Sequence, residues 1–184
     1  KGIVEKTTAA ELRKLRTKKG NKLIFLDELL EFLKPIKGLY VEFEMKTSPV
    51  EYYPEERLKE YCDKLYSAVM AARPDDAEYV FTSSDYRGLR YLQQIHPGVD
   101  LLMITSKPCN AETIDLALAL GIKRIGCTMD GTSRQAVKKA HDKGLIVSLW
   151  PGYSPDDLML GAYLGADFMC TDIPVQLKKF QTEK

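Results

Sequence analysis

The sequence has few of the residues that mark a catalytic or metal site on their own. Its 184 residues include two histidines, His96 and His141. Both are expected near helix C-termini, so they form no catalytic pair. The four cysteines show neither a CxxC spacing nor the framework of a small disulfide-rich domain. This cysteine pattern favours a reducing compartment, although the destination in the cell stays open between cytoplasm, periplasm and secretion.

Charge and hydropathy exclude two further classes. The formal net charge is +1, and no basic field of the nucleic-acid-binding kind appears. The cluster of Lys14, Arg16, Lys18 and Lys19 contains no aromatic residue and has acidic residues near it, so we interpret it as a solvated surface. No apolar run is long enough to span a membrane. A chain of this length, 45% hydrophobic, can bury the core of one domain.

Short apolar runs alternate with helix-length segments after residue 38. The expected strands are 39–46, 79–83, 100–104, 124–128, 145–150 and 167–171. The expected helices are a short one before residue 20, then 26–33, 54–73, 85–96, 113–121, 133–143 and two more from 154 and 174. Such a repeat predicts an α/β fold with a parallel sheet. Because no glycine-rich dinucleotide turn follows any strand, a TIM-type (β/α)8 barrel lacking its first two strands is favoured over an open nucleotide-binding sheet.

The segment 39–46 carries the most informative polar pattern. With a period of two, Tyr40, Glu42, Glu44 and Lys46 point one way and apolar side chains point the other. One interpretation is a half-exposed strand with a solvated face. The other places this face in a protein interior, where charged groups persist only if they pair or bind a ligand. Glu44 and Lys46 would then lie at the strand end that lines a barrel's catalytic mouth.

Two other strand ends offer weaker candidates. Ser83 and Ser84 follow a strand, but Ser and Asp at that point are first of all helix caps. Trp150 is the only tryptophan and ends its strand at the same predicted mouth as Glu44. Core packing between helix and sheet is the competing interpretation for its ring.

Six motifs along the chain together resemble the glycerophosphodiester phosphodiesterase family, in the family's order. They are Thr-Ala-Ala-Glu-Leu at 8–12, Leu-Asp-Glu-Leu-Leu at 26–30, Val-Glu-Phe-Glu-Met-Lys at 41–46, Phe-Thr-Ser-Ser-Asp at 81–85, the Gly-to-Trp strand 144–150 and Gly-Ala-Asp-Phe-Met-Cys-Thr-Asp-Ile-Pro at 165–174. The resemblance implies a TIM barrel that hydrolyses glycerophosphodiesters to an alcohol and sn-glycerol 3-phosphate with a divalent cation, Ca²⁺ or Mg²⁺. It implies that Glu44 binds the metal, that Lys46 contacts the phosphate, and that Trp150 lines the substrate pocket.

The sequence departs from the family at its start. The family's catalytic histidines and its Glu-x-Asp metal pair belong to the first two strands and are not found here, so they are expected before Lys1. The chain alone is then expected to be inactive. The resemblance makes 1–184 one domain, with 1–24 as the end of a small inserted region and 25–184 as the last six βα units. Pro151 stands where the family usually has Thr.

Three functional hypotheses follow. The first is an enzyme acting on a small-molecule glycerophosphodiester, with no nucleic-acid partner and the oligomeric state left open. The second is a truncated barrel that binds a phosphate-bearing ligand or a partner without turnover, although its open strand edges would be an aggregation hazard. The third and weakest is an open sheet that binds a nucleotide.

Overall fold

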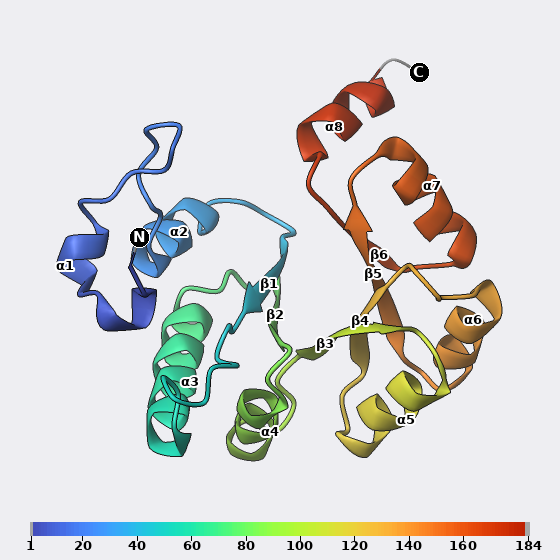
Figure 1. The fold of residues 1–184 in the computed structure, drawn as a ribbon, viewed down its shortest axis with the longest axis horizontal. Helices are drawn as coiled ribbons and strands as arrows, with labels where there is room; N and C mark the ends of the chain where they lie inside the picture. Colours follow the sequence, from blue (N-terminus) through green and yellow to red (C-terminus); the bar gives the residue numbers. More distant parts are fainter. Residues whose placement is uncertain (1, 183–184) are drawn as a thin grey trace. The chain divides into compact units, whose positions relative to one another are not determined.

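The computed structural model describes residues 2–182, with side chains up to residue 178. Within this range, strands and helices alternate as the sequence predicts (Figure 1). The strands are β1 (Tyr40–Glu44), β2 (Glu78–Ser83), β3 (Leu101–Pro108), β4 (Arg124–Thr128), β5 (Ile146–Gly152) and β6 (Phe168–Thr171). The helices are η1 (Val4–Lys6, 3-10), α1 (Ala9–Leu12), α2 (Leu26–Leu33), α3 (Glu55–Ala71), α4 (Tyr86–Ile95), α5 (Ala111–Ala119), α6 (Arg134–Asp142), α7 (Pro155–Leu164) and α8 (Pro174–Thr182).

The described strands form one sheet in the order β1-β2-β3-β4-β5-β6. Each neighbouring pair from β2 to β6 is parallel. Helix α5 packs against β3 and β4, and helices α6 and α7 both pack against β5. Figure 1 shows these three helices along the same side of strands β4 to β6. The predicted α/β class with a parallel sheet is therefore confirmed, whereas the two further strands of a closed barrel stay a prediction.

Polar side chains cap the starts of several described helices. Thr8 and Glu11 form a capping box on α1, and the Asp85 carboxylate accepts from the Arg87 N–H at 3.2 Å. The side chains of Asn110, Ser133 and Ser154 cap α5, α6 and α7 in the same way. None of the helices within residues 2–182 combines the length and apolar character needed to cross a membrane.

The chain divides into two compact units. One comprises Lys1–Val41 and Thr47–Tyr79, and the other comprises Glu42–Lys46 and Val80–Lys184. In the first unit, α3 buries Leu58, Cys62 and Val69. The core of the second unit contains side chains that are at most 1% exposed, among them Met45, Phe81, Leu89, Leu92, Leu102, Met103, Ile125, Val147 and Leu149. The second unit contains every residue that the sequence assigns to the site.

Candidate functional site

A charged pair lies at the C-terminal end of β1. Glu44 is the last residue of the strand, and Lys46 Nζ lies 2.9 Å from Glu44 Oε1. The alternate side chains Phe43 and Met45 are buried at 6% and 1% exposure. The predicted alternation of an apolar and a polar face along this strand is thus confirmed.

The polar face of β1 is exposed, which corrects the expectation that it would point into an interior. The side chains of Glu44 and Lys46 are 40% and 79% exposed. The reason is that β1 is an end strand of the described sheet, with a neighbour on one side only. Between exposed groups such a pair contributes about 0–1 kcal/mol to stability. The pair therefore contributes little to the stability of the fold, and both of its side chains are accessible to a ligand.

Strand register places Glu44 and Trp150 on the same face of the sheet. The rings of Phe43 and Phe81 contact each other at 6.2 Å between centroids, so these two residues share the opposite face. Met45 N donates to Thr82 O at 2.8 Å, which sets Glu44 beside Thr82. From Thr82 the pairing continues through Leu102, Arg124 and Ile146. Trp150 lies four residues beyond Ile146 on β5 and therefore shares this face.

Three polar atoms on this face are buried without a hydrogen-bond partner among the described residues. They are the Trp150 Nε1, the Ser148 Oγ and the Thr82 Oγ1 atoms. Thr82 and Ser148 are 1% and 7% exposed. A buried polar atom without a partner costs about 1–3 kcal/mol, so the face suits a ligand or water that supplies the missing bonds. Sequence reasoning missed both hydroxyls, because Ser and Thr within apolar strands carry no spacing signal.

Cys170 is another residue on this face that sequence reasoning did not connect with the site. It lies on β6, two residues after Phe168, which pairs with Ser148. The pKa of the Cys170 thiol is raised, first by its partial burial and then by the negative charges of Glu42, Asp172 and Glu44. The carboxylates of β1 and the end of β6 thus act on one thiol.

Cysteine reactivity tests this arrangement. Cys62, Cys109 and Cys127 are 0% exposed, whereas Cys170 is exposed. We expect iodoacetamide to alkylate Cys170 alone in the native chain, and more slowly than an ordinary thiol, because a raised pKa leaves less thiolate at neutral pH. Peptide mapping by mass spectrometry after a short reaction measures this. All four cysteines should react in denaturant, and native labelling of Cys109 or Cys127 would contradict the packing described.

The described residues do not by themselves complete a metal site. Glu44 supplies a carboxylate oxygen, which suits a hard cation such as Ca²⁺ or Mg²⁺. Among the residues that the structure describes, no group of three His, Cys, Asp or Glu side chains is placed to hold an ion. Glu44 is the carboxylate at this strand end whose chemistry suits such an ion.

Ser83 and His141 make contacts that join elements of the fold. Ser83 Oγ donates to Met45 O at 2.6 Å and accepts from Asp85 N at 2.9 Å, so it ties β1 to β2 and fits the capping interpretation. His141 Nε2 lies 2.9 Å from Asp167 Oδ2, a pairing that the sequence did not reveal. His141 belongs to the last turn of α6, just before β5 begins, and His96 caps α4 before β3 begins. Neither histidine lies at a C-terminal strand end.

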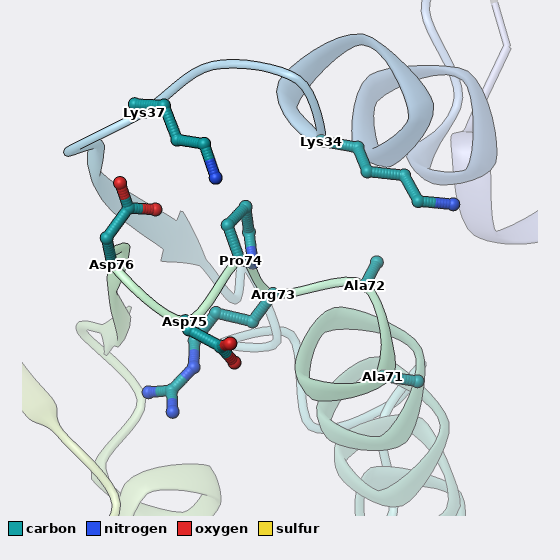
Figure 2. Close-up of a pocket in the computed structure, with 8 residues that line it drawn as sticks. All are labelled: Lys34, Lys37, Ala71, Ala72, Arg73, Pro74, Asp75 and Asp76. Carbon is teal, nitrogen blue, oxygen red and sulfur yellow. The ribbon is translucent and has the colours of Figure 1, made fainter.

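Two surface cavities lie away from this face. One, of about 440 Å³, forms where α2 and α3 end in the first unit, and Figure 2 shows Lys37 pointing into it. It is lined by Lys34, Lys37, Ala71, Ala72, Arg73, Pro74, Asp75 and Asp76. The other, of about 500 Å³, is lined by Arg134, Gln135, Val137, Lys138, His141, Leu164 and Gly165. Neither of these two cavities includes Glu44, Lys46 or Trp150.

In (β/α)8 barrel enzymes the active-site residues lie at the C-terminal ends of the strands, and the Glu44–Lys46 pair lies at such an end. The sequence profile of the glycerophosphoryl diester phosphodiesterase family matches residues 1–176. The chain therefore belongs to this family, as its motifs indicated. No curated protein sequence matches the chain.

Solved structures share the fold at low sequence identity. A candidate glycerophosphodiester phosphodiesterase from Galdieria sulphuraria is 19% identical with a TM-score of 0.84, and the match covers 99% of this chain and 73% of that one. An Oleispira antarctica phosphodiesterase, solved with the product sn-glycerol-3-phosphate, is 17% identical with a TM-score of 0.84 and coverage of 98% and 73%. A glycerophosphodiester phosphodiesterase from Parabacteroides distasonis is 19% identical with a TM-score of 0.74 and coverage of 96% and 71%.

Proposed function

We propose that this chain is part of an enzyme that hydrolyses glycerophosphodiesters to an alcohol and sn-glycerol 3-phosphate. The observation that carries the proposal is the Glu44–Lys46 pair at the end of β1, on the same sheet face as Trp150, in a member of this family. The product bound to the Oleispira antarctica phosphodiesterase supports a small-molecule substrate of this class.

The residues of this chain suit binding and charge neutralisation. Cleavage of a phosphodiester needs positive charge at the non-bridging oxygens, a base for the nucleophile and an acid for the leaving alcohol. The exposed Lys46 ammonium can neutralise a phosphate oxygen, and the 2.9 Å contact with Glu44 orients it. Trp150 offers an apolar wall and an indole N–H that has no hydrogen-bond partner among the described residues. The acid and base are proposed to be the family's histidines, so this chain alone should bind the product without turning substrate over.

Fluorescence of the only tryptophan provides a direct binding test. Adding glycerol 3-phosphate to the chain should change the Trp150 emission, because the ligand would reach the indole from the same face as Lys46. Lys46→Gln should weaken this binding by about tenfold or more, the usual value of a hydrogen bond to a charged group. Lys64→Gln, which removes an exposed lysine of α3, is the matched control. An unchanged emission, or equal weakening in both variants, would contradict the assignment.

We also propose that a divalent cation, Ca²⁺ or Mg²⁺, binds at this site with Glu44 as one ligand. When bound, the cation would neutralise charge on the phosphate and lower the pKa of a coordinated water. We expect a chelator to abolish glycerol 3-phosphate release by the protein as its native host makes it. Adding back Ca²⁺ or Mg²⁺ should restore the rate. Full activity after dialysis against the chelator would contradict a role for the cation.

The alternative is a binding or assembly module without turnover. The position of both histidines near the starts of strands, and not near Glu44, favours this alternative for the chain taken alone. The enzyme hypothesis and the module hypothesis predict different results in one assay. The enzyme hypothesis predicts release of glycerol 3-phosphate by the host-made protein, whereas the module hypothesis predicts ligand binding with no product.

A further inference from the structure

The segment 14–24 of the first unit folds as a short hairpin. Thr17 N donates to Asn21 O and Gly20 N donates to Thr17 O, both at 2.9 Å. An antiparallel bridge joins Arg16 and Lys22. Gly20 has φ of +82°, the left-handed conformation that closes a turn of this kind. Lys18 and Lys19 occupy the two positions at the tip.

Every charged side chain of the hairpin is basic. Residues 14–24 contain five basic side chains and no acidic one, namely Lys14, Arg16, Lys18, Lys19 and Lys22. All five residues are exposed. Within the described chain, the four lysines form no ion pair, and the Arg16 guanidinium donates to the Arg13 and Leu15 carbonyls. Nearby acids are engaged elsewhere, because Glu11 bonds Thr8 and Asp27 pairs with Arg13.

Aliphatic side chains are exposed in the same hairpin. Leu15, Leu23 and Ile24 are 50%, 36% and 63% exposed. Exposing three aliphatic side chains to water, beside five cations, does not stabilise a loop that is only solvated. A surface that combines the two matches the interface of a bilayer, which offers negative headgroups next to hydrocarbon.

We propose that the hairpin at residues 14–24 docks the protein on an anionic lipid surface. Its lysines would lie against the headgroups, and Leu15, Leu23 and Ile24 would reach the hydrocarbon boundary. Single-stranded nucleic acid is the less suitable polyanion, because its binding sites use aromatic stacking and residues 14–24 contain no aromatic side chain. The lysines that the sequence places on a solvated surface are thus assigned to a lipid-binding surface, whatever the activity of the protein.

Vesicle co-sedimentation tests the proposal with the full chain. We expect binding to phosphatidylcholine vesicles that contain phosphatidylserine, little binding to phosphatidylcholine alone, and loss of binding in high salt. The double variant Lys18→Glu and Lys19→Glu should weaken binding by about tenfold or more, from the usual contribution of each cation near a charged bilayer. The variant Leu23→Ser and Ile24→Ser should weaken binding at low salt while leaving the slope of its salt dependence unchanged, because it removes no charge.

The matched control reverses two exposed lysines of the other unit, Lys123 and Lys139, to Glu. This control should bind vesicles like the parent chain, and circular dichroism should show every variant folded. Equal weakening in the control would mean that net charge alone is responsible and would overturn the proposal. So would no binding to anionic vesicles, or binding to an oligonucleotide but not to vesicles.

Discussion

Replacing Glu44 with glutamine is expected to lower kcat/KM for a glycerophosphodiester by about two to three orders of magnitude, the usual loss when one preorganised electrostatic group is removed. The amide keeps the size of the side chain but loses the charge that holds Lys46 Nζ at 2.9 Å. It is also a poorer ligand for a hard cation than a carboxylate. Initial rates of glycerol 3-phosphate release by the host-made protein measure this effect.

Glu78→Gln is the matched control for this variant. Glu78 is an exposed carboxylate at the first residue of β2, at the strand end opposite to the one that Glu44 occupies on β1. The same chemical change there should leave kcat/KM within about twofold of the parent value, as expected of a surface substitution away from the site. Equal activity of Glu44→Gln and the parent protein would refute the site assignment.

Replacing Phe81 with alanine is expected to lower the free energy of unfolding by about 3–5 kcal/mol, the usual cost of removing a buried phenylalanine ring. Phe81 is 0% exposed and contacts Phe43, so the truncation leaves a cavity beneath β1 and β2. This is a large part of the roughly 5–15 kcal/mol that stabilises a typical domain. Urea unfolding followed by Trp150 emission measures the loss in the unit that contains the site.

Phe32→Ala provides the comparison for the core variant. Phe32 lies on α2 and is 66% exposed, so its removal should change the free energy of unfolding by about 0.5 kcal/mol or less. A loss of about 0.5 kcal/mol or less for Phe81→Ala as well would mean that the ring at position 81 is not buried, and the face assignment of β1 and β2 would fail with it.

Strand positions could be predicted because each strand is a short apolar run between turn or cap residues. The run 124–128 coincides with β4, and 26–33 coincides with α2. The predicted 113–121 helix begins two residues earlier, at Ala111, because Asn110 caps it. Local chemistry thus fixes an element's existence and approximate bounds, and the identity of the cap fixes its first residue.

Two strands extend beyond the ends that their apolar runs predict. β3 continues through polar residues to Pro108, and β5 continues past Pro151 to Gly152. In both strands the register shifts, between Ile104 and Pro108 and between Leu149 and Gly152. A shift in register accommodates a proline that cannot donate a ladder hydrogen bond. Such pairing depends on the neighbouring strand and cannot be seen in the strand's own sequence.

The site was predictable only in part. The period of two in 39–46 correctly gives the shared face of Glu44 and Lys46, but not the exposure of that face, which depends on neighbouring strands. The grouping of Cys170 with Glu42 and Glu44 links residues that are more than 120 positions apart in the sequence. No local pattern encodes such a contact, because it follows from the arrangement of the whole sheet.

The most direct test of the central claim is phosphorus NMR of a glycerophosphodiester incubated with the protein as its native host makes it. We expect the diester signal to be replaced by that of glycerol 3-phosphate, and the Glu44→Gln protein to leave almost all of the diester unchanged over the same time. A diester signal that persists with the parent protein, in the presence of Ca²⁺ or Mg²⁺, would contradict hydrolysis. It would favour the hypothesis of a binding module without turnover.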